Sequence, residues 1–356
     1  MHDVLTTWGW DAGWEVLLAA HQLGLHHQAA RVTAQERDRW SIQLADGPVE
    51  ARLVGTHDGP LPVTGDWVVV EPGPLPTDPW TLRDVLSRRT AISRGSAGEG
   101  GGEQLLAANV DVIWIVQPLD VPINPRSIER YLAVAWESGA VPVVVLTKAD
   151  LVTDLALARA EVATVALGVD VHVVRVDDDA SLAALRATLR PGRTVALLGP
   201  SGAGKSTLVN TLAGAHQLET GEVRAFDRKG RHTTTRRELY QIAGGALLMD
   251  TPGLRELRIW TLDEGLAGAF PEIDELAATC RFRDCRHDAE PGCAVVAAVE
   301  AGQLAADRLA SYRKLQAEAA WIDRKHDARA RAAAVSQHKT ALKTMKHHPK
   351  YRPEDR

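Results

Sequence analysis

The clearest chemical signature is a glycine-rich loop of the kind that binds phosphate groups. Residues 199–206 have the sequence Gly-Pro-Ser-Gly-Ala-Gly-Lys-Ser, between an apolar run at 194–198 and a helical run at 207–212. Glycines let backbone N–H groups point into one concavity, and the helix N-terminus adds positive potential. Lys205 would reach the β and γ phosphates of a nucleotide, and the Ser206 hydroxyl would ligate Mg²⁺. The predicted nucleotide-binding residues are Gly199, Pro200, Ser201, Gly202, Ala203, Gly204, Lys205, Ser206 and Thr207.

A second motif predicts which base is bound. The phosphate loop alone suits transporter-type ATPases and nucleoside monophosphate kinases equally well. Thr147-Lys148-Ala149-Asp150 follows a buried-strand pattern at 141–146, at the carboxyl end of a strand, where ligands of parallel sheets bind. The Asp150 carboxylate can accept hydrogen bonds from guanine N1–H and the 2-amino group, which adenine lacks, and Lys148 would lie along the base. Thr147 stands where Asn is usual and is shorter, so we expect a weaker tie to the phosphate loop.

A third motif supplies the metal and γ-phosphate contacts. Asp250-Thr-Pro-Gly253 follows the apolar run 246–249. Asp250 would hold Mg²⁺ through a water molecule, and the Gly253 N–H would bind the γ-phosphate. Residues 230–235, Gly-Arg-His-Thr-Thr-Thr, fit a first switch in which Thr234 or Thr235 closes on Mg²⁺. Thr234 is the first choice, although an ordinary polar loop would have the same composition.

The residue after the third motif bears on the identity of the catalytic group. Many GTPases place Gln directly after the glycine of the third motif to orient the attacking water. This chain has Leu254 there, which cannot do so. His232 is the candidate catalytic residue, with a surface histidine as the alternative, and Lys205 and Thr234 complete the predicted catalytic set. Residues 177–181, Asp-Asp-Asp-Ala-Ser, replace the usual turn against the base, so we expect that contact to be degenerate or made by backbone.

The three cysteines and one histidine form a separate constellation. Cys280, Cys285, His287 and Cys293 fall within fourteen residues, and the chain has no other cysteine. Three thiolates and one imidazole match a closed, tetrahedral, structural Zn²⁺ site; reduced cysteines clustered by chance are the alternative. Arg281, Arg283 and Arg286 lie between or beside these ligands, and residues 321–356 hold ten Lys and Arg against four Asp and Glu. Such charges suit a phosphate backbone, or else simply a solvated helical face.

The elements that must position these motifs form three units. Residues 31–90 alternate short apolar runs with turns, which predicts a small barrel. Its local charge is acidic, and Trp40 and Trp67 are candidate core residues. Strand–helix alternation from 109 predicts a doubly wound parallel sheet, and the chain after about 269 is mostly helical. The predicted domains are 1–95, 96–268 and 269–356, with a glycine-rich linker at 95–102.

Composition excludes some classes of protein. The 356 residues carry a net charge of −5 and 45% hydrophobic content, which supports sizeable cores and gives no strong partner signal. The start lacks a basic segment before an apolar core, so no signal peptide is predicted. No apolar run approaches the ~18 residues that span a bilayer. We therefore expect a cytoplasmic protein without a membrane partner, and nothing requires more than a monomer.

The order of the motifs carries a resemblance. The guanine motif precedes the phosphate loop, and Asp250–Gly253 follows both, whereas ordinary GTPases begin with the phosphate loop. This order, residues 230–235 and the Cys-x4-Cys-x-His-x5-Cys cluster resemble the ribosome small-subunit-dependent GTPases, the RsgA or YjeQ family. Residues 105–111, 128–132 and 285–293 also look like that family. The resemblance covers about residues 30–350, and the first twenty-five residues, with Trp8, Trp10 and Trp14, are less securely covered.

The resemblance implies a fold and a function. It implies an oligonucleotide-binding (OB) barrel, a circularly permuted P-loop GTPase domain and a zinc-binding helical domain. It also implies a GTPase with Mg²⁺, one structural Zn²⁺, GTP and GDP as ligands, and the small ribosomal subunit and its rRNA as partners. Such a protein assists late subunit maturation, and subunit-stimulated hydrolysis of GTP to GDP and phosphate drives its release. The family's proposed catalytic histidine falls on His232.

The residues alone are also compatible with two other classes of function. One is an RNA-binding module with a structural, slowly turned-over guanine nucleotide. The other is an ATP-driven kinase or transporter subunit, which the absence of a Leu-Ser-Gly-Gly-Gln sequence disfavours. Only about thirty residues separate Asp250–Gly253 from Cys280. We therefore expect loss of the γ-phosphate to move the unit that contains the metal cluster.

Overall fold

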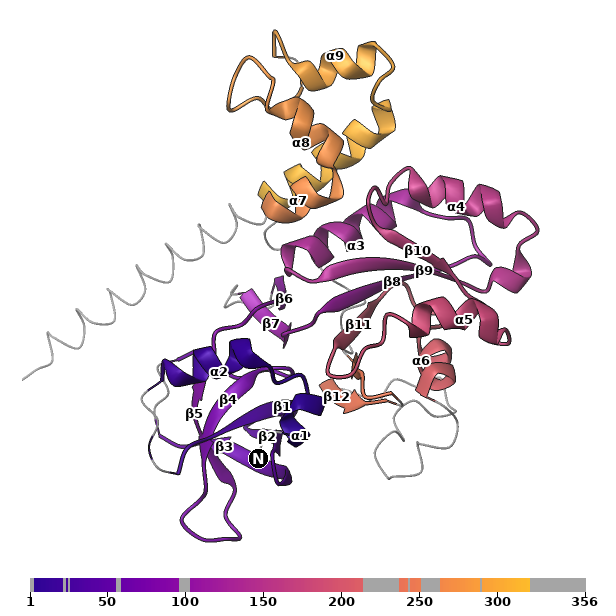
Figure 1. The fold of residues 1–356 in the computed structure, drawn as a ribbon. Helices are drawn as coiled ribbons and strands as arrows, with labels where there is room; N and C mark the ends of the chain where they lie inside the picture. The colour runs from indigo at the N-terminus through magenta and orange to yellow at the C-terminus, as the bar shows by residue number, and fades with distance from the viewer. Residues whose placement is uncertain are drawn as a thin grey trace, which may run out of the picture.

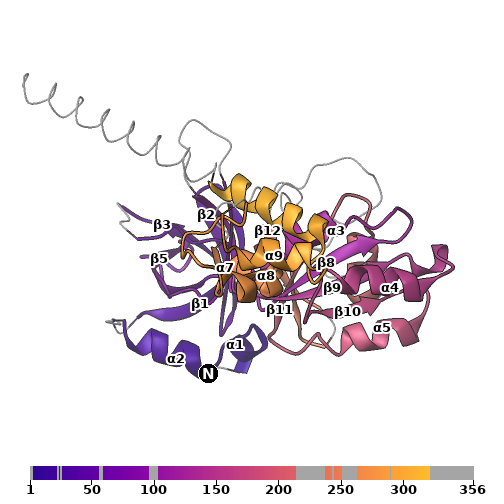
Figure 2. The same cartoon turned by 90° about the horizontal axis from the view of Figure 1, so that it is seen from above.

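The protein has three structural units arranged along the chain. The computed structural model describes residues 3–21, 24, 26–55, 59–95, 103–213, 237–242, 244–250, 263–288 and 290–320. Figure 1 shows a barrel in indigo and purple, an α/β unit in magenta, and a helical unit in orange and yellow beside helix α3 (Pro125–Glu137). Figure 2 gives the view from above, in which helices α1 (Asp3–Thr7) and α2 (Ala12–Ala19) lie beside the barrel.

The first unit is a closed five-stranded barrel, as the sequence predicted. Its strands are β1 (Gln28–Glu36), β2 (Arg39–Leu44), β3 (Gly47–Leu53), β4 (Trp67–Glu71) and β5 (Trp80–Val85). Pairing runs β1–β2–β3–β5–β4 and returns to β1, with only β3 and β5 parallel. Alternate residues such as Val32, Ile42 and Val68 fill the interior. Closure removes the unpaired edges that an open sheet would expose.

Two short helices complete the barrel on its outside. α1 (Asp3–Thr7) and α2 (Ala12–Ala19) precede the first strand. Trp10 and Trp14 are buried and pack against Trp67, with ring centroids 4.7 and 6.0 Å away. The N-terminal segment, which the sequence left unassigned, is therefore part of this unit. Trp40 is also buried, so both expected core tryptophans are confirmed.

The second unit is a parallel sheet with helices on both faces. Its strands are β8 (Val112–Pro118), β9 (Val141–Thr147), β10 (Asp170–Val173), β11 (Thr194–Leu198) and β13 (Leu247–Asp250), with antiparallel β12 (Arg237–Gln241) at one side. The order is β10-β9-β8-β11-β13-β12. Residues 96–102, most of the predicted linker, lie outside the described residues. β6 (Ala91–Gly95) and β7 (Glu103–Ala108) form a hairpin before this sheet.

Side chains alternate between the two faces of the sheet. Ile113, Ile115 and Val144 pack with α3 (Pro125–Glu137) and α4 (Leu155–Ala163). Their neighbours Val112, Trp114 and Val143 pack with α5 (Asp179–Arg186) and α6 (Lys205–Ala213) on the other face. α3 begins at Pro125, directly after the capping residue Asn124.

Strand β12 joins the barrel to the sheet. It pairs with β13 on one side and, through Ala34↔Glu238 and Gln35↔Arg237, with β1 on the other. The two units therefore share one continuous eleven-stranded sheet. Because β12 directly follows residues 230–235 in sequence, the barrel is hydrogen-bonded to the strand that leaves the predicted first switch.

The third unit is helical and docks on α3. It contains α7 (Asp263–Ala269), α8 (Pro271–Ala277), α9 (Ala294–Glu300) and a helix at 306–320. Arg308 donates to Glu129 Oε1 of α3 at 2.8 Å and to Glu272 Oε1 of α8 at 2.6 Å. Ser311 also donates to the Glu129 carboxylate. In the part of the chain that is described, no helix is long and apolar enough to cross a membrane.

Candidate nucleotide and metal sites

The phosphate loop lies at the carboxyl edge of the sheet, between its two halves. It connects β11 to α6, and β11 pairs with β8 on one side and β13 on the other. Gly199 has φ +144°, and a Cβ on it would lie 2.3 Å from the Val116 carbonyl oxygen. Only glycine therefore allows the loop to pass so close to β8. Chain order reverses at this point of the sheet, which is where open α/β sheets bind ligands.

The loop residues are arranged for phosphate contact. Gly202 and Gly204 have φ of +79° and +84°, which helps successive N–H groups converge. Lys205 Nζ lies across the loop and donates to the carbonyl oxygens of Gly199 and Pro200, each at 2.7 Å. Ser206 and Thr207 are exposed in the first turn of α6, the end of a helix that favours anions.

The guanine motif contacts the phosphate loop directly. Thr147 Oγ1 donates to the Ala203 carbonyl oxygen at 2.7 Å, and Thr147 is buried. The shorter side chain therefore does reach the loop. Lys148 has φ +58° and its Nζ forms an ion pair with Asp120 at 2.6 Å. Asp150 is exposed in a short 3₁₀ helix, Ala149–Leu151. Asp120 could not be predicted as a partner of Lys148, because it belongs to the loop after the neighbouring strand β8.

The acidic loop after β10 stands beside the guanine motif. β10 is parallel to β9, so residues 174–178 emerge at the same edge as residues 147–150. Arg175 forms an ion pair with Asp177 at 3.1 Å, and this hydrogen bond lowers the pKa of the Asp177 carboxyl. Asp178 caps α5 by accepting from the Ala180 N–H. Asp179 pairs with Arg186 at 3.0 Å, so all three aspartates have local partners, which agrees with a base contact made by backbone.

Several predicted residues cannot be located. His232, Thr234, Thr235, Gly253 and Leu254 lie outside the described residues. The backbone of Asp250 is described and ends β13, one strand away from the phosphate loop. The third motif therefore begins at the expected edge of the sheet, and the switch contacts stay predictions.

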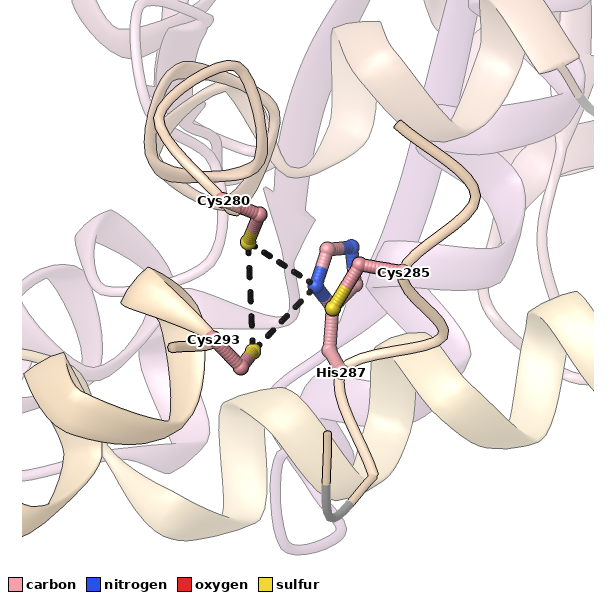
Figure 3. Close-up of side chains that lie close together, drawn as sticks. All are labelled: Cys280, Cys285, His287 and Cys293. Carbon is pink, nitrogen blue, oxygen red and sulfur yellow. Dashed lines mark hydrogen bonds between the residues drawn. The ribbon is translucent and has the colours of Figure 1, made fainter. Parts of the chain in front are cut away.

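The structure brings the three cysteines and the histidine together (Figure 3). Their ligand atoms all lie within 4.8 Å of one another. Cys280 Sγ and Cys293 Sγ are each 3.6 Å from His287 Nδ1 and 3.9 Å from each other. Tetrahedral Zn²⁺ with bonds of about 2.3 Å to sulfur and 2.0 Å to nitrogen gives edges of about 3.8 and 3.5 Å. The four residues therefore fit a zinc ion.

Local structure holds the four side chains in place. Gly292 has φ +80° and the turn that contains it places Cys293 at the start of α9, where Val296 N–H donates to its Sγ at 3.4 Å. His287 has φ +60°, and its carbonyl accepts from Arg313. Burial lowers the pKa of His287, which favours the neutral imidazole that binds metals. Burial raises the pKa of Cys285 to about 11; metal binding must overcome this to form the thiolate.

Comparison with known proteins identifies the family. The RsgA GTPase family model matches residues 85–260. A Streptomyces coelicolor protein named "Small ribosomal subunit biogenesis GTPase RsgA" is 46% identical over 346 residues, covering 95% of this chain and 93% of that protein. A protein of the same name from Opitutus terrae is 46% identical over 312 residues, 84% of this chain and 85% of that protein. The chain belongs to the RsgA GTPase family.

Solved structures agree on the fold. The crystal structure of YjeQ from Thermotoga maritima has a TM-score of 0.61 at 24% identity, over 82% of this chain and 98% of that one. YloQ, described as a circularly permuted GTPase, has a TM-score of 0.60 at 22% identity, over 84% of this chain and 97% of that one. The permuted motif order is therefore a property of the fold. As an RsgA family member, the chain is a GTP hydrolase of a ribosome biogenesis family, and GTP with Mg²⁺ is its nucleotide.

Proposed function

We propose that this GTPase binds the small ribosomal subunit in its GTP form, assists late maturation and leaves after hydrolysis. The names of the relatives support the subunit as partner. One observation carries the nucleotide part: the Thr147 hydroxyl bonds to the carbonyl of Ala203. This contact joins the base-reading motif to the phosphate loop in one site. We expect the work to occur in the cytoplasm and the protein to act as a monomer.

We infer specific roles around the nucleotide. Residues 199–207 would cradle the phosphates, with Lys205 on the β and γ groups. Asp150 would read guanine and Lys148 would lie along the base. Ser206, Thr234 and Asp250 would hold Mg²⁺ directly or through water, and the Gly253 N–H would bind the γ-phosphate. The metal supplies charge neutralisation for phosphoryl transfer, while the protein positions the groups.

We infer that Cys280, Cys285, His287 and Cys293 hold one structural Zn²⁺. The fit of their spacing supports this. Four protein ligands leave no open position, so this ion would take no part in hydrolysis. We infer three domains, predicted at 1–95, 96–268 and 269–356, with the zinc site inside the last; because α7 (Asp263–Ala269) is part of the helical unit, the first boundary of that last domain belongs before Asp263.

We infer that the zinc-bearing unit contributes to RNA contact. Arg281, Arg283 and Arg286 are exposed, and none of them forms an ion pair with a carboxylate of the described residues. The barrel offers fewer free charges, since Arg83, Arg88 and Arg89 pair with Glu71, Asp66 and Asp11. The basic residues 321–356 lie outside the described residues. If about six charges contact RNA, log K should fall against log salt with a slope of about −4 to −5.

Turnover should depend on the subunit. Leu254 cannot orient water, so slow intrinsic hydrolysis is expected, and His232 is the proposed catalytic residue. His232→Ala should abolish most stimulated turnover while sparing GTP binding; unchanged turnover would remove His232 from the mechanism. A partner that completes a GTPase site raises rates by about 10³–10⁵.

The deciding experiment measures GTP hydrolysis with and without purified small ribosomal subunits. Stimulation of hydrolysis by at least about a hundredfold would support the proposal. This threshold is well below the increase of about 10³–10⁵ that a partner completing a GTPase site can give. Stoichiometric retained GTP without stimulation would favour the RNA-binding module with a structural nucleotide. Large ribosomal subunits serve as the control for non-specific ribosomal RNA.

A further inference from the structure

A polar pocket lies on the side of the sheet away from the phosphate loop. It has a volume of about 420 Å³ and lies between the N-terminal helices, the barrel and the parallel sheet. Asp111 and Thr194 stand at the amino ends of β8 and β11, whereas the phosphate loop follows the carboxyl end of β11. The pocket is therefore separate from the nucleotide site.

The walls of the pocket approach each other closely. Gly9, in the turn between α1 and α2, has φ +91°, and a Cβ on it would lie 2.6 Å from the Gly192 carbonyl oxygen. Gly192 itself has φ +73°. Side chains are thus excluded where the N-terminal helices meet the loop before β11, so this wall of the pocket is built from backbone.

Positive charge is in excess around the pocket. Four arginines and two aspartates line it: Arg31, Arg89, Arg190, Arg193, Asp11 and Asp111. Both carboxylates are already engaged. Asp11 accepts two hydrogen bonds from Arg89, at 2.5 and 2.6 Å, and Asp111 accepts one from the Thr194 N–H at 2.7 Å. Among the described residues, no carboxylate pairs with the other three arginines.

Arg31 is the unusual member, because it is a buried cation without an acidic partner. It is 2% exposed, and its Nη2 donates to the Asn109 carbonyl at 3.1 Å and to Thr194 Oγ1 at 3.2 Å. Its Nε has no hydrogen-bond partner. Burial lowers its pKa to about 10 against the pull of the nearest carboxylates. A buried charge normally requires pairing, so its position is costly unless an anion compensates it.

We propose that this pocket binds a phosphate group through the guanidinium groups of Arg31 and Arg193, with Arg190 at its rim. Guanidinium groups match phosphate oxygens in charge and in geometry. The excess of two positive charges suits a phosphate group, which carries about −1.5 to −2 charges near neutral pH when it is terminal and one negative charge in an RNA backbone. A bound phosphate would neutralise Arg31 and link the N-terminal helices, the barrel and the sheet. Its source is either a small phosphorylated molecule or the backbone of an RNA.

The test uses inorganic phosphate as the probe and the full chain as the sample. The protein is first saturated with Mg²⁺ and a non-hydrolysable GTP analogue, so that the phosphate loop is occupied. Calorimetry at constant ionic strength then compares a titration with phosphate to a control titration with chloride. We expect one saturable site. Arg193→Gln should weaken it by about tenfold or more, the usual loss for a charged hydrogen bond. Arg186→Gln is the matched control, since Arg186 is outside the pocket and pairs with exposed Asp179.

The outcomes separate the two sources and the failure of the idea. Arg31→Met should weaken binding at least as much as Arg193→Gln; if Arg31→Met does not fold, Arg193→Gln carries the test, because the Arg193 side chain is only half-buried. An RNA oligonucleotide with hydroxyl ends that displaces phosphate would identify RNA as the source, and one that does not would identify a small phosphate ester. Phosphate binding absent from the wild type, or equal in wild type and Arg193→Gln, would overturn the proposal. The calorimetric test does not measure nucleotide hydrolysis. Its result is therefore independent of whether the proposed GTPase function is correct.

Discussion

The attachment of the zinc-bearing unit to helix α3 should depend on a single buried arginine. The Arg308 and Glu129 side chains are only 6% and 3% exposed, and Arg308 also donates to Glu272 and to the Ala269 carbonyl. Its guanidinium lies 4.3 Å from the Phe270 ring centroid. Arg308→Met keeps most of the stem but leaves the Glu129 charge buried, which should cost about 3–5 kcal/mol.

A neighbouring pair provides the matched control. Arg130 and Glu318 join the same two helices at 2.7 Å, but their side chains are 31% and 29% exposed. Arg130→Met should therefore cost only about 0.2–1 kcal/mol.

Hydrogen exchange is the appropriate assay, because a chain with several units need not unfold in one step. In α8 and the helix at 306–320, Arg308→Met should reduce amide protection by about 10² to 10³-fold. Equal losses in Arg308→Met and Arg130→Met would refute the reasoning. Retained protection in Arg308→Met would mean that apolar packing alone holds the unit.

Three further predictions concern the two sites. Thr147→Val removes the bond to the Ala203 carbonyl and should weaken GTP binding by about fivefold, worth roughly 1 kcal/mol, whereas Thr147→Ser should retain it; equal affinities by calorimetry would contradict this. Gly199→Ala should abolish GTP binding, because its Cβ would meet the backbone of β8, while Gly202→Ala, with open space around it, should lose less. Cys293→Ser should lose its equivalent of zinc by metal analysis and lower the melting temperature; full zinc content would exclude Cys293 as a ligand.

Local patterns were enough to predict most of the fold. β11 matches its predicted bounds, and the closed barrel followed from short apolar runs between turns. The phosphate loop and the cysteine cluster were predictable because their residues are close in sequence, so spacing alone fixes the geometry. The guanine motif could be assigned to the same edge of the sheet as the phosphate loop because both follow parallel strands.

Long-range partners could not be predicted in the same way. Nothing in the run 28–36 distinguishes Arg31 from an exposed strand residue, because the groups around its guanidinium, Asn109, Thr194 and Trp67, are far away in sequence. Arg308 and Glu129 are 179 residues apart, and each is unremarkable in its own helix. Trp10 and Trp14 pack on Trp67, which lies more than fifty residues later in the chain, so this contact could not be predicted from the local pattern.

The most direct test of the central claim changes the base that the enzyme reads. The central claim is that Asp150 and the phosphate loop form one nucleotide site, and that the small subunit stimulates hydrolysis of the GTP bound there. Hydrolysis of GTP and of XTP should be measured with small subunits for wild type and for Asp150→Asn. We predict that wild type is stimulated with GTP, and that Asp150→Asn is stimulated only with XTP. Unchanged preference for GTP in Asp150→Asn, or no stimulation of either protein, would contradict the account.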